Sequence, residues 1–124
     1  MSTILVIDDE TEFCEFVKTA LETNGHDVTM SHSGAEAMSI LETLSPDLIL
    51  MDVKMPDVNG LELLPRIKEV SRRSTVLVLS AVNDYNIADL LYEVGADGYL
   101  TKPIHLKNLL ETVERNLENA GSMR

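Results

Sequence analysis

The chain alternates five short segments, rich in apolar and β-branched residues, with longer segments that have apolar residues at helical spacing. The short segments predict strands over residues 4–7, 28–30, 48–51, 76–79 and 98–101. Two of them, residues 48–51 and 76–79, contain only apolar side chains, which is typical of strands buried on both faces. Strands that alternate with helices predict an α/β fold whose parallel sheet is covered by helices on both sides.

The longer segments predict five amphipathic helices. The first ends near Gly25, and the second begins at a capping box formed by Ser33 and Glu36 and ends at Ser45-Pro46. The third and fourth are predicted over residues 61–70 and 84–94. The apolar residues expected to face the core are Phe13, Phe16, Val17, Ala20 and Leu21 in the first helix, Ala37, Met38, Leu41 and Leu44 in the second, Ile87, Leu90, Leu91 and Val94 in the fourth, and Leu106, Leu109, Leu110, Val113 and Leu117 in the last.

Length and charge limit the class of protein. The 124 residues are enough for one domain with a real core. The 10 basic and 21 acidic residues give a formal net charge of −11, which opposes nucleic acid binding and suits a divalent cation or a basic protein partner. The apolar runs are too short to span a membrane, and we expect no signal peptide.

The cysteine and histidine residues exclude two kinds of site. Cys14 is the single cysteine, which excludes an internal disulfide and fits a reducing cytoplasm, where we expect the protein to be located. His26, His32 and His105 are scattered and lack the spacing of a zinc site. We expect one domain over residues 1–120, followed by a flexible tail or truncated linker over residues 121–124.

Polar side chains suited to phosphate chemistry follow four of the expected strands. Asp8 and Asp9 follow the first strand, Asp52 the third, Ser80 the fourth and Lys102 the fifth. Parallel strands end at the same edge of a sheet, and open α/β sheets bind their ligands at that edge. We therefore expect these five side chains to converge on one site.

The chemistry of this cluster points to phosphoryl transfer. Two unit charges about 4 Å apart repel by roughly 4 kcal/mol at an effective dielectric constant near 20, so three clustered carboxylates need a cation. Oxygen ligands favour Mg²⁺, which we expect Asp8 and Asp9 to hold. Asp52, at the end of a central strand, is the expected nucleophile that would form an aspartyl phosphate. Lys102 would pair with the phosphate, and Ser80 would donate a hydrogen bond to it.

Four motifs occur in order along the chain. They are ILVIDDE at residues 4–10, DLILMDVKMPDVNG at 47–60, LSA at 79–81 and GADGYLTKP at 95–103. One of them alone would be a modest signal. Together, at these spacings, they resemble the receiver domains of bacterial two-component response regulators, and the resemblance extends from about Ile4 to Leu117.

The resemblance implies a fold and a function. The fold is a flavodoxin-like (βα)5 doubly wound parallel sheet with strand order 2-1-3-4-5. The function is Mg²⁺-dependent phosphoryl transfer from the phosphohistidine of a histidine kinase or phosphotransfer protein to Asp52. Such a domain is not an enzyme acting on other substrates, although it catalyses its own phosphorylation and dephosphorylation. Phosphorylation would switch the surface of the fourth helix, fifth strand and fifth helix, which would control a downstream partner or a fused output domain.

The resemblance also assigns roles to individual residues. Asp9, Asp52 and the backbone carbonyl of Lys54 would bind the metal directly, and Asp8 would bind it through water. The Ser80 hydroxyl would move toward the phosphate, and Tyr99 would turn inward behind it.

Three further positions depend on the same resemblance. The peptide bond between Lys102 and Pro103 is expected to be cis, which X-Pro bonds adopt at small cost. Lys54 and Val82 would flank the phosphate and tune its lifetime. Val82 offers no polar group to orient a water molecule, and Lys54 can shield the phosphate, so we expect a long-lived aspartyl phosphate.

Alternative functions and the oligomeric state remain open at this stage. The main alternative is a degenerate receiver that acts as a phosphorylation-independent interaction scaffold. A phosphatase that uses an aspartyl phosphate would need an acid where Lys54 stands, and a nucleotide-binding module would need a glycine-rich loop after the first strand. We expect a monomer or a weak phosphorylation-dependent dimer, without direct contact with nucleic acid or membrane.

Overall fold

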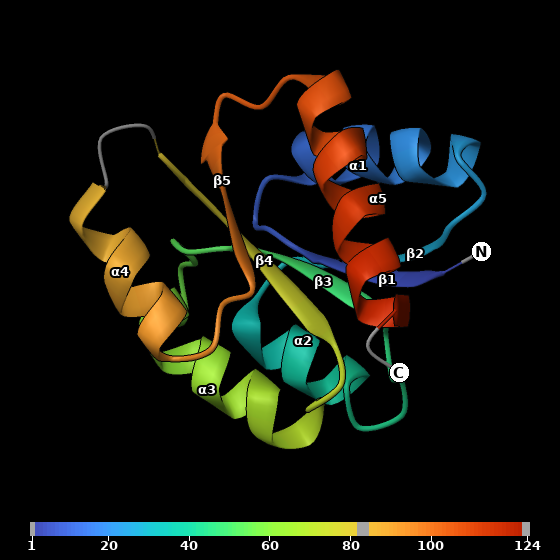
Figure 1. Ribbon diagram of the computed structural model, residues 1–124. Coiled ribbons are helices and arrows are strands. Elements are labelled where there is room, and N and C mark those ends of the chain that lie inside the picture. The colour runs from blue at the N-terminus through green and yellow to red at the C-terminus, as the bar shows by residue number, and fades with distance from the viewer. Residues whose placement is uncertain (1, 82–84, 123–124) are drawn as a thin grey trace.

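A computed structural model describes residues 2–81 and 85–122 as five strands and five helices (Figure 1). The strands are β1 (Thr3–Ile7), β2 (Asp27–Ser31), β3 (Leu48–Asp52), β4 (Thr75–Ala81) and β5 (Gly98–Lys102). The helices are α1 (Thr11–Thr23), α2 (Gly34–Ile40), α3 (Gly60–Val70), α4 (Tyr85–Glu93) and α5 (Leu106–Ser122). Strands and helices alternate along the chain, as the sequence pattern predicts. No helix in the described ranges is both long and apolar enough to cross a membrane.

The strands form one parallel sheet in the order β2-β1-β3-β4-β5. This order confirms the predicted doubly wound topology. The chain starts at β1, next to one edge of the sheet, continues to the edge strand β2, and then crosses back over β1 to the central strand β3. The four apolar residues 48–51 of the central strand β3 are buried, as predicted, and so is Asp52 at its end.

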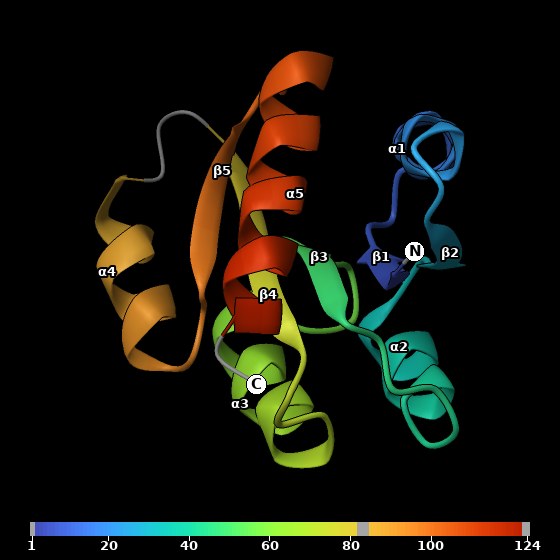
Figure 2. The ribbon, with the colours of Figure 1, turned by 45° about the vertical axis from the view of Figure 1, so that its right-hand side comes forward.

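Helices cover both faces of the sheet, and each face has its own core (Figure 2). On one face, α1 and α5 pack against the sheet through residues that include Val17, Leu21 and Leu109. On the other face, α2, α3 and α4 pack through residues that include Ala37, Ile67 and Leu91. Successive residues of a strand point to opposite faces, so each strand contributes to both cores.

Local signals at two helix ends agree with their predicted roles. Gly25 has φ +90°, a left-handed conformation that favours glycine after a helix C-terminus. The Ser33 side chain accepts a hydrogen bond from the Glu36 N–H and caps α2. The reciprocal half of the predicted capping box differs, because the Glu36 carboxylate accepts from the His32 N–H at 2.7 Å. The helix itself ends at Ile40, earlier than the predicted end at Ser45-Pro46, and the chain continues from there in turns.

The predicted inward stripes are wrong at three positions. Phe16 is 49% exposed, Leu90 48% and Leu106 40%. Each helical residue is rotated by about 100° from its neighbour, so an apolar residue next to a buried one can lie at the edge of the contact with the sheet. In α1 the fully buried positions are Cys14, Val17 and Leu21, which leaves Phe16 outside the core.

Candidate functional site

The strand register brings the polar strand ends to one edge. Ile7 of β1 pairs with Met51 of β3, so the residues that follow them, Asp8 and Asp52, are neighbours. At the other side of β4, Ala81 pairs with Lys102 of β5. The sheet therefore brings residues from β1, β3 and β5 to a common site, whereas Ser80 of β4, also expected there, follows Val78 on the face that α2, α3 and α4 cover.

Strand alternation explains why three of these side chains meet. Ile7 and Met51 belong to the core under α2, α3 and α4, so the next residues, Asp8 and Asp52, point to the α1 and α5 side. Leu100 packs in the core on the α1 and α5 side, and alternation returns Lys102 to that same side.

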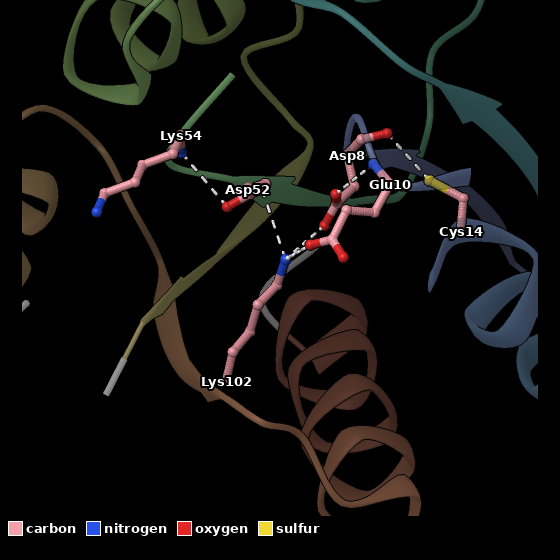
Figure 3. Close-up of polar contacts among 6 residues, drawn as sticks. All are labelled: Asp8, Glu10, Cys14, Asp52, Lys54 and Lys102. Carbon is pink, nitrogen blue, oxygen red and sulfur yellow. Dashed lines mark hydrogen bonds and ion pairs between the residues drawn. The ribbon is translucent and has the colours of Figure 1, made fainter. Parts of the chain in front are cut away.

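The Lys102 ammonium is the common partner of three carboxylates (Figure 3). It donates to Asp8 Oδ2 at 2.8 Å and lies 3.5 Å from both Glu10 Oε1 and Asp52 Oδ2. Asp8 is fully buried and Asp52 is 8% exposed, so water screens these charges weakly. The second oxygen of Asp8 accepts the Glu10 N–H at 3.0 Å.

Asp8, Asp9 and Asp52 form an oxygen-donor cluster suited to a hard cation. One carboxylate oxygen from each residue lies within 4.8 Å of the others. Asp9 is exposed, whereas Asp8 and Asp52 are buried, so the cluster opens to solvent on one side. Oxygen donors on one open side suit Mg²⁺, which keeps several waters and binds few carboxylates. The donor set therefore fits the expected metal.

The electrostatics of the site shift two pKa values. Burial, followed by the nearby Asp8 charge, raises the pKa of Asp52 above its usual value, although Lys102 opposes the shift. Burial lowers the pKa of Lys102, but the hydrogen bond to Asp8 and the charge of Asp52 outweigh it, so the pKa lies above the usual value. The site is therefore short of positive charge, since one ammonium faces several carboxylates.

Lys54 contacts the site through its backbone. Its N–H lies 3.3 Å from Asp52 Oδ1 and donates to it. Its side chain is exposed and extends away from the Lys102 ammonium (Figure 3). Val82, the other residue expected to tune the phosphate lifetime, lies outside the described residues.

Two residues of α1, Phe13 and Cys14, contact residues of the site. The Lys102 ammonium lies 4.6 Å from the centre of the Phe13 ring, a cation–π contact. Cys14 is buried, and its thiol donates to the backbone carbonyl of Asp8 at 3.2 Å. Burial and the Asp8 charge raise the pKa of Cys14 to about 11, so the thiol stays protonated and donates.

Ser80 and Tyr99 share the face of the sheet that α4 covers. Ser80 is 2% exposed and lies two residues after Val78, which pairs with Tyr99. Val78 and the half-buried Tyr99 both belong to the core under α2, α3 and α4, and alternation places Ser80 on that side. The predicted switch residues are thus neighbours on adjacent strands. The Lys102-Pro103 peptide bond is cis, as expected.

Three contacts of the site were not predicted. The sequence identifies Glu10 only as the last residue of the ILVIDDE motif, Phe13 as a core residue and Cys14 as a cysteine that forms no internal disulfide. The run of three acids was a usable signal for Glu10, since its third member is also near the strand end. The contacts of Phe13 and Cys14 depend on how α1 lies against β5 and β1, which local periodicity does not specify.

Comparison with known proteins agrees with the site. The family model described as response regulator receiver domain matches residues 4–114. The transcriptional regulatory protein TrcR of Mycobacterium tuberculosis is 36% identical over 97% of this chain and 47% of its own length. The transcriptional regulator NtrC of Azospirillum brasilense is 39% identical over 95% of this chain and 24% of its own length.

Solved structures show the same architecture. A CheY-like response regulator receiver domain protein from Methanospirillum hungatei is similar with a TM-score of 0.95 and 26% identity, covering 100% of this chain and 99% of that one. The curated relatives are longer, and this chain spans 47% and 24% of the two named above.

Proposed function

Because this chain belongs to the response regulator receiver domains, a family that works by phosphoryl transfer to an aspartate, we propose that Asp52 is its phosphoacceptor. One observation carries the proposal. Asp52 is a nearly buried carboxylate at the end of the central strand, with Lys102 and two further acids converging on it. The donor would be the phosphohistidine of a histidine kinase or phosphotransfer protein.

The proposed reaction transfers one phosphoryl group. An oxygen of the Asp52 carboxylate attacks phosphorus, and the P–N bond to the donor histidine breaks, with the electron pair going to the imidazole nitrogen. The Lys102 ammonium, 3.5 Å from Asp52 Oδ2, is close enough to move from Asp8 onto the transferred phosphoryl oxygens. It would offset negative charge that develops there.

Asp8, Asp9 and Asp52 are the residues that would hold Mg²⁺, together with the backbone carbonyl of Lys54. When bound, the ion would neutralise carboxylate and phosphoryl charge at this edge. The oxygen cluster within 4.8 Å supports this assignment.

Ser80 and Tyr99 are proposed to report the phosphorylation. Phosphorylation adds nearly two negative charges at Asp52. The Ser80 hydroxyl would donate to the new phosphoryl oxygens, and the space it leaves on its face of the sheet would admit the Tyr99 ring. The half-buried position of Tyr99 beside the α4 contacts supports transmission to the surface of α4, β5 and α5.

The primary test is phosphate uptake. The protein is incubated with radiolabelled acetyl phosphate and Mg²⁺, and incorporation of label is measured. We expect the parent to be labelled and Asp52→Asn to remain unlabelled. Label in Asp52→Asn at the parent level would contradict the assignment, and an unlabelled parent would favour the scaffold alternative. The complete set of Asp8, Asp9, Ser80 and Lys102 argues against that alternative.

The phosphodonor protein is proposed to dock on the groove between α1 and α5. This groove is lined by Glu12, Glu15, Phe16, Thr19, Ala20, Thr23, Asn24, Leu106 and Leu110. Both helices begin at the same sheet edge, a few residues beyond Asp9 and Lys102, so a partner seated there could present a histidine to Asp52. Exposed Phe16 and Leu106 offer apolar contact, and Glu12 and Glu15 favour a partner with basic residues.

The lifetime of the aspartyl phosphate is proposed to depend on Lys54 and Val82. Neither side chain can orient a water molecule for attack as an amide or carboxylate would. We expect Lys54→Asn/Val82→Glu to lose its phosphoryl group severalfold faster than the parent when donor is removed. Equal loss rates, measured from retained label over time, would contradict this role.

A further inference from the structure

The loop that follows Asp52 is tied to the start of α2 by one carboxylate. Asp57 Oδ1 accepts the Gly34 N–H at 3.0 Å, and Oδ2 accepts the Ala35 N–H at 2.9 Å. These two donors are at the first turn of α2, where backbone N–H groups lack partners within the helix. The two hydrogen bonds lower the pKa of Asp57, so the carboxylate is ionised well below neutral pH.

The same loop carries the carbonyl proposed as a metal ligand. Its base is closed by a bridge between Lys54 and Asn59 and by a hydrogen bond from the Gly60 N–H to the Val53 carbonyl at 2.8 Å. Between these closures the chain from Met55 to Val58 forms the tip, which includes Asp57. Holding the tip therefore restrains Lys54 at the base.

Packing reinforces the carboxylate contact. A Cβ added at Gly34 would lie 2.3 Å from Cγ1 of Val58, and so glycine is needed for the loop tip to sit this close to α2. The tip thus contacts α2 through one ionic group and one apolar group, from adjacent residues.

The start of α2 also contacts the other half of the metal site. The Asp8 N–H donates to the carbonyl of Ser31 at 3.0 Å, and the Ser31 hydroxyl donates to the carbonyl of Ser33, the α2 cap, at 2.9 Å. Segments that are distant in the sequence, around Asp8 and around Lys54, are therefore both anchored to the turn between β2 and α2.

We propose that Asp57 is a positioning residue for the metal site, which holds the loop from Val53 to Asn59 against α2 and so keeps the Lys54 carbonyl in register with Asp8 and Asp52. The inference rests on the proposed function in its use of the Lys54 carbonyl as a ligand. Asp57 itself does not contact the metal. Its effect is on affinity, because a displaced loop must be reordered each time the ion binds.

The experiment measures Mg²⁺ affinity directly, by titration of backbone amide signals in NMR spectra of the protein without phosphodonor. We expect Asp57→Ala to weaken binding about tenfold, a size typical of residues that orient ligands from outside the coordination sphere. Asp57→Asn keeps one acceptor oxygen and is expected to weaken binding less. At saturating Mg²⁺, phosphate uptake from acetyl phosphate should return to the parent level in both variants.

Loss of a negative charge would by itself weaken cation binding, so a matched control is needed. Glu62→Gln removes an exposed carboxylate from the first turn of α3 next to the same loop. We expect it to bind Mg²⁺ nearly as the parent does. An affinity in Asp57→Ala no lower than in Glu62→Gln would overturn the proposal.

A charge-neutral pair tests the same geometry independently. Gly34→Ala should weaken Mg²⁺ binding, because the new methyl group collides with Val58, and Gly34→Ala/Val58→Ala should restore it, because the colliding methyl is gone. Parent-like affinity in Gly34→Ala would overturn the proposal. The variants could bind Mg²⁺ with the expected order of affinities while the parent takes up no phosphate. That result would refute the proposed function and leave the positioning role of Asp57 intact.

Discussion

The buried carboxylates at the sheet edge differ in how well their charge is balanced. Asp8 has a partner for each oxygen, the Glu10 N–H and the Lys102 ammonium. Asp52 lies farther from Lys102, at 3.5 Å, and its other oxygen accepts a long hydrogen bond of 3.3 Å from the Lys54 N–H. The negative charge of Asp52, the proposed nucleophile, is therefore less well balanced by hydrogen bonds and ion pairs than that of Asp8. Its ionised form is unfavourable in the resting protein, and neutralisation by a bound cation relieves that cost.

This imbalance predicts that Asp52→Asn stabilises the metal-free protein at neutral pH. Folding raises the pKa of Asp52 above 3.8, so the folded state binds its proton more tightly than the unfolded chain. The contribution of this carboxyl to stability therefore falls as pH rises from 3.8 through the folded-state pKa and stays low above it. We expect the variant to gain on the order of 1 kcal/mol at pH 7.

Chemical denaturation in EDTA at two pH values measures the effect. The gain of Asp52→Asn over the parent should be present at about pH 7 and vanish near pH 3, below the usual aspartate pKa. Asp89→Asn, at an exposed position of α4, is the control and should leave stability unchanged at both values. A loss of stability in Asp52→Asn at pH 7 would contradict the electrostatic account.

The position of a residue at the end of a parallel strand explains which site residues could be predicted from the sequence. Asp8, Asp52 and Lys102 each end or follow an apolar run, and a parallel sheet must bring such ends to one edge. Asp57 follows no strand, and its partners Gly34 and Ala35 are more than 20 residues away. A contact of that kind depends on the path of a loop, for which the sequence has no periodic signal.

At the scale of helices, the errors in prediction have a common origin. The apolar periodicity identified every helix, but it also predicted that Phe16, Leu90 and Leu106 lie in the core. In the structure these three side chains are between 40% and 49% exposed. In α1, α4 and α5 the apolar stripe is wider than the contact of the helix with the sheet. Residues at the edge of a stripe are therefore exposed, and in α1 and α5 they line a shared groove.

The groove predicts a selective defect in protein-dependent phosphorylation. Phe16→Ala/Leu106→Ala removes apolar surface that is already half in solvent, so we expect a stability loss on the order of 1 kcal/mol. Transfer from a histidine kinase should slow severalfold, since the docking contact is lost. Labelling by acetyl phosphate should be unchanged, because that small donor needs no docking surface.

Rates of both reactions, measured side by side, check this prediction. Val70→Ala is the matched control, because Val70 is an exposed apolar residue at the far end of α3, 55% exposed and outside the groove. It should slow neither reaction. Equal slowing of kinase and acetyl phosphate reactions in the groove variant would point to damage at the site instead of a docking defect.

At the scale of the whole molecule, ion pairs connect separate elements at two places: the site edge of the sheet and the opposite edge. Asp97 accepts from Lys68 Nζ at 2.7 Å and from the Val76 N–H at 2.8 Å, which joins α3 to the start of β4 and β5. Asp97 therefore takes part in the intramolecular structure, although it lies next to the surface of α4, β5 and α5. At the site edge, the corresponding connection is the cluster around Lys102, which joins β1, β3 and β5.

The carboxylates at the site edge repel one another, and this predicts that Mg²⁺ strongly stabilises the whole fold. The formal net charge is −11, and Asp8, Asp9 and Asp52 add local repulsion at one edge. A ligand that binds only the folded state stabilises it by RT ln(1 + [L]/Kd), which is about 2.7 kcal/mol at a hundredfold excess over Kd. Thermal unfolding with increasing MgCl2 should show Tm rising with the logarithm of concentration.

Screening of the net charge must be separated from specific binding in this experiment. NaCl at matched ionic strength screens the −11 charge but does not fill the carboxylate cluster, so it should raise Tm by much less. Asp9→Asn removes the exposed member of the cluster and should respond to MgCl2 only as it responds to NaCl. If the parent also gained no more from MgCl2 than from NaCl, the three carboxylates would not form a metal site. Their convergence would then be a cost of the fold that Lys102 and the N–H groups of Glu10 and Lys54 offset.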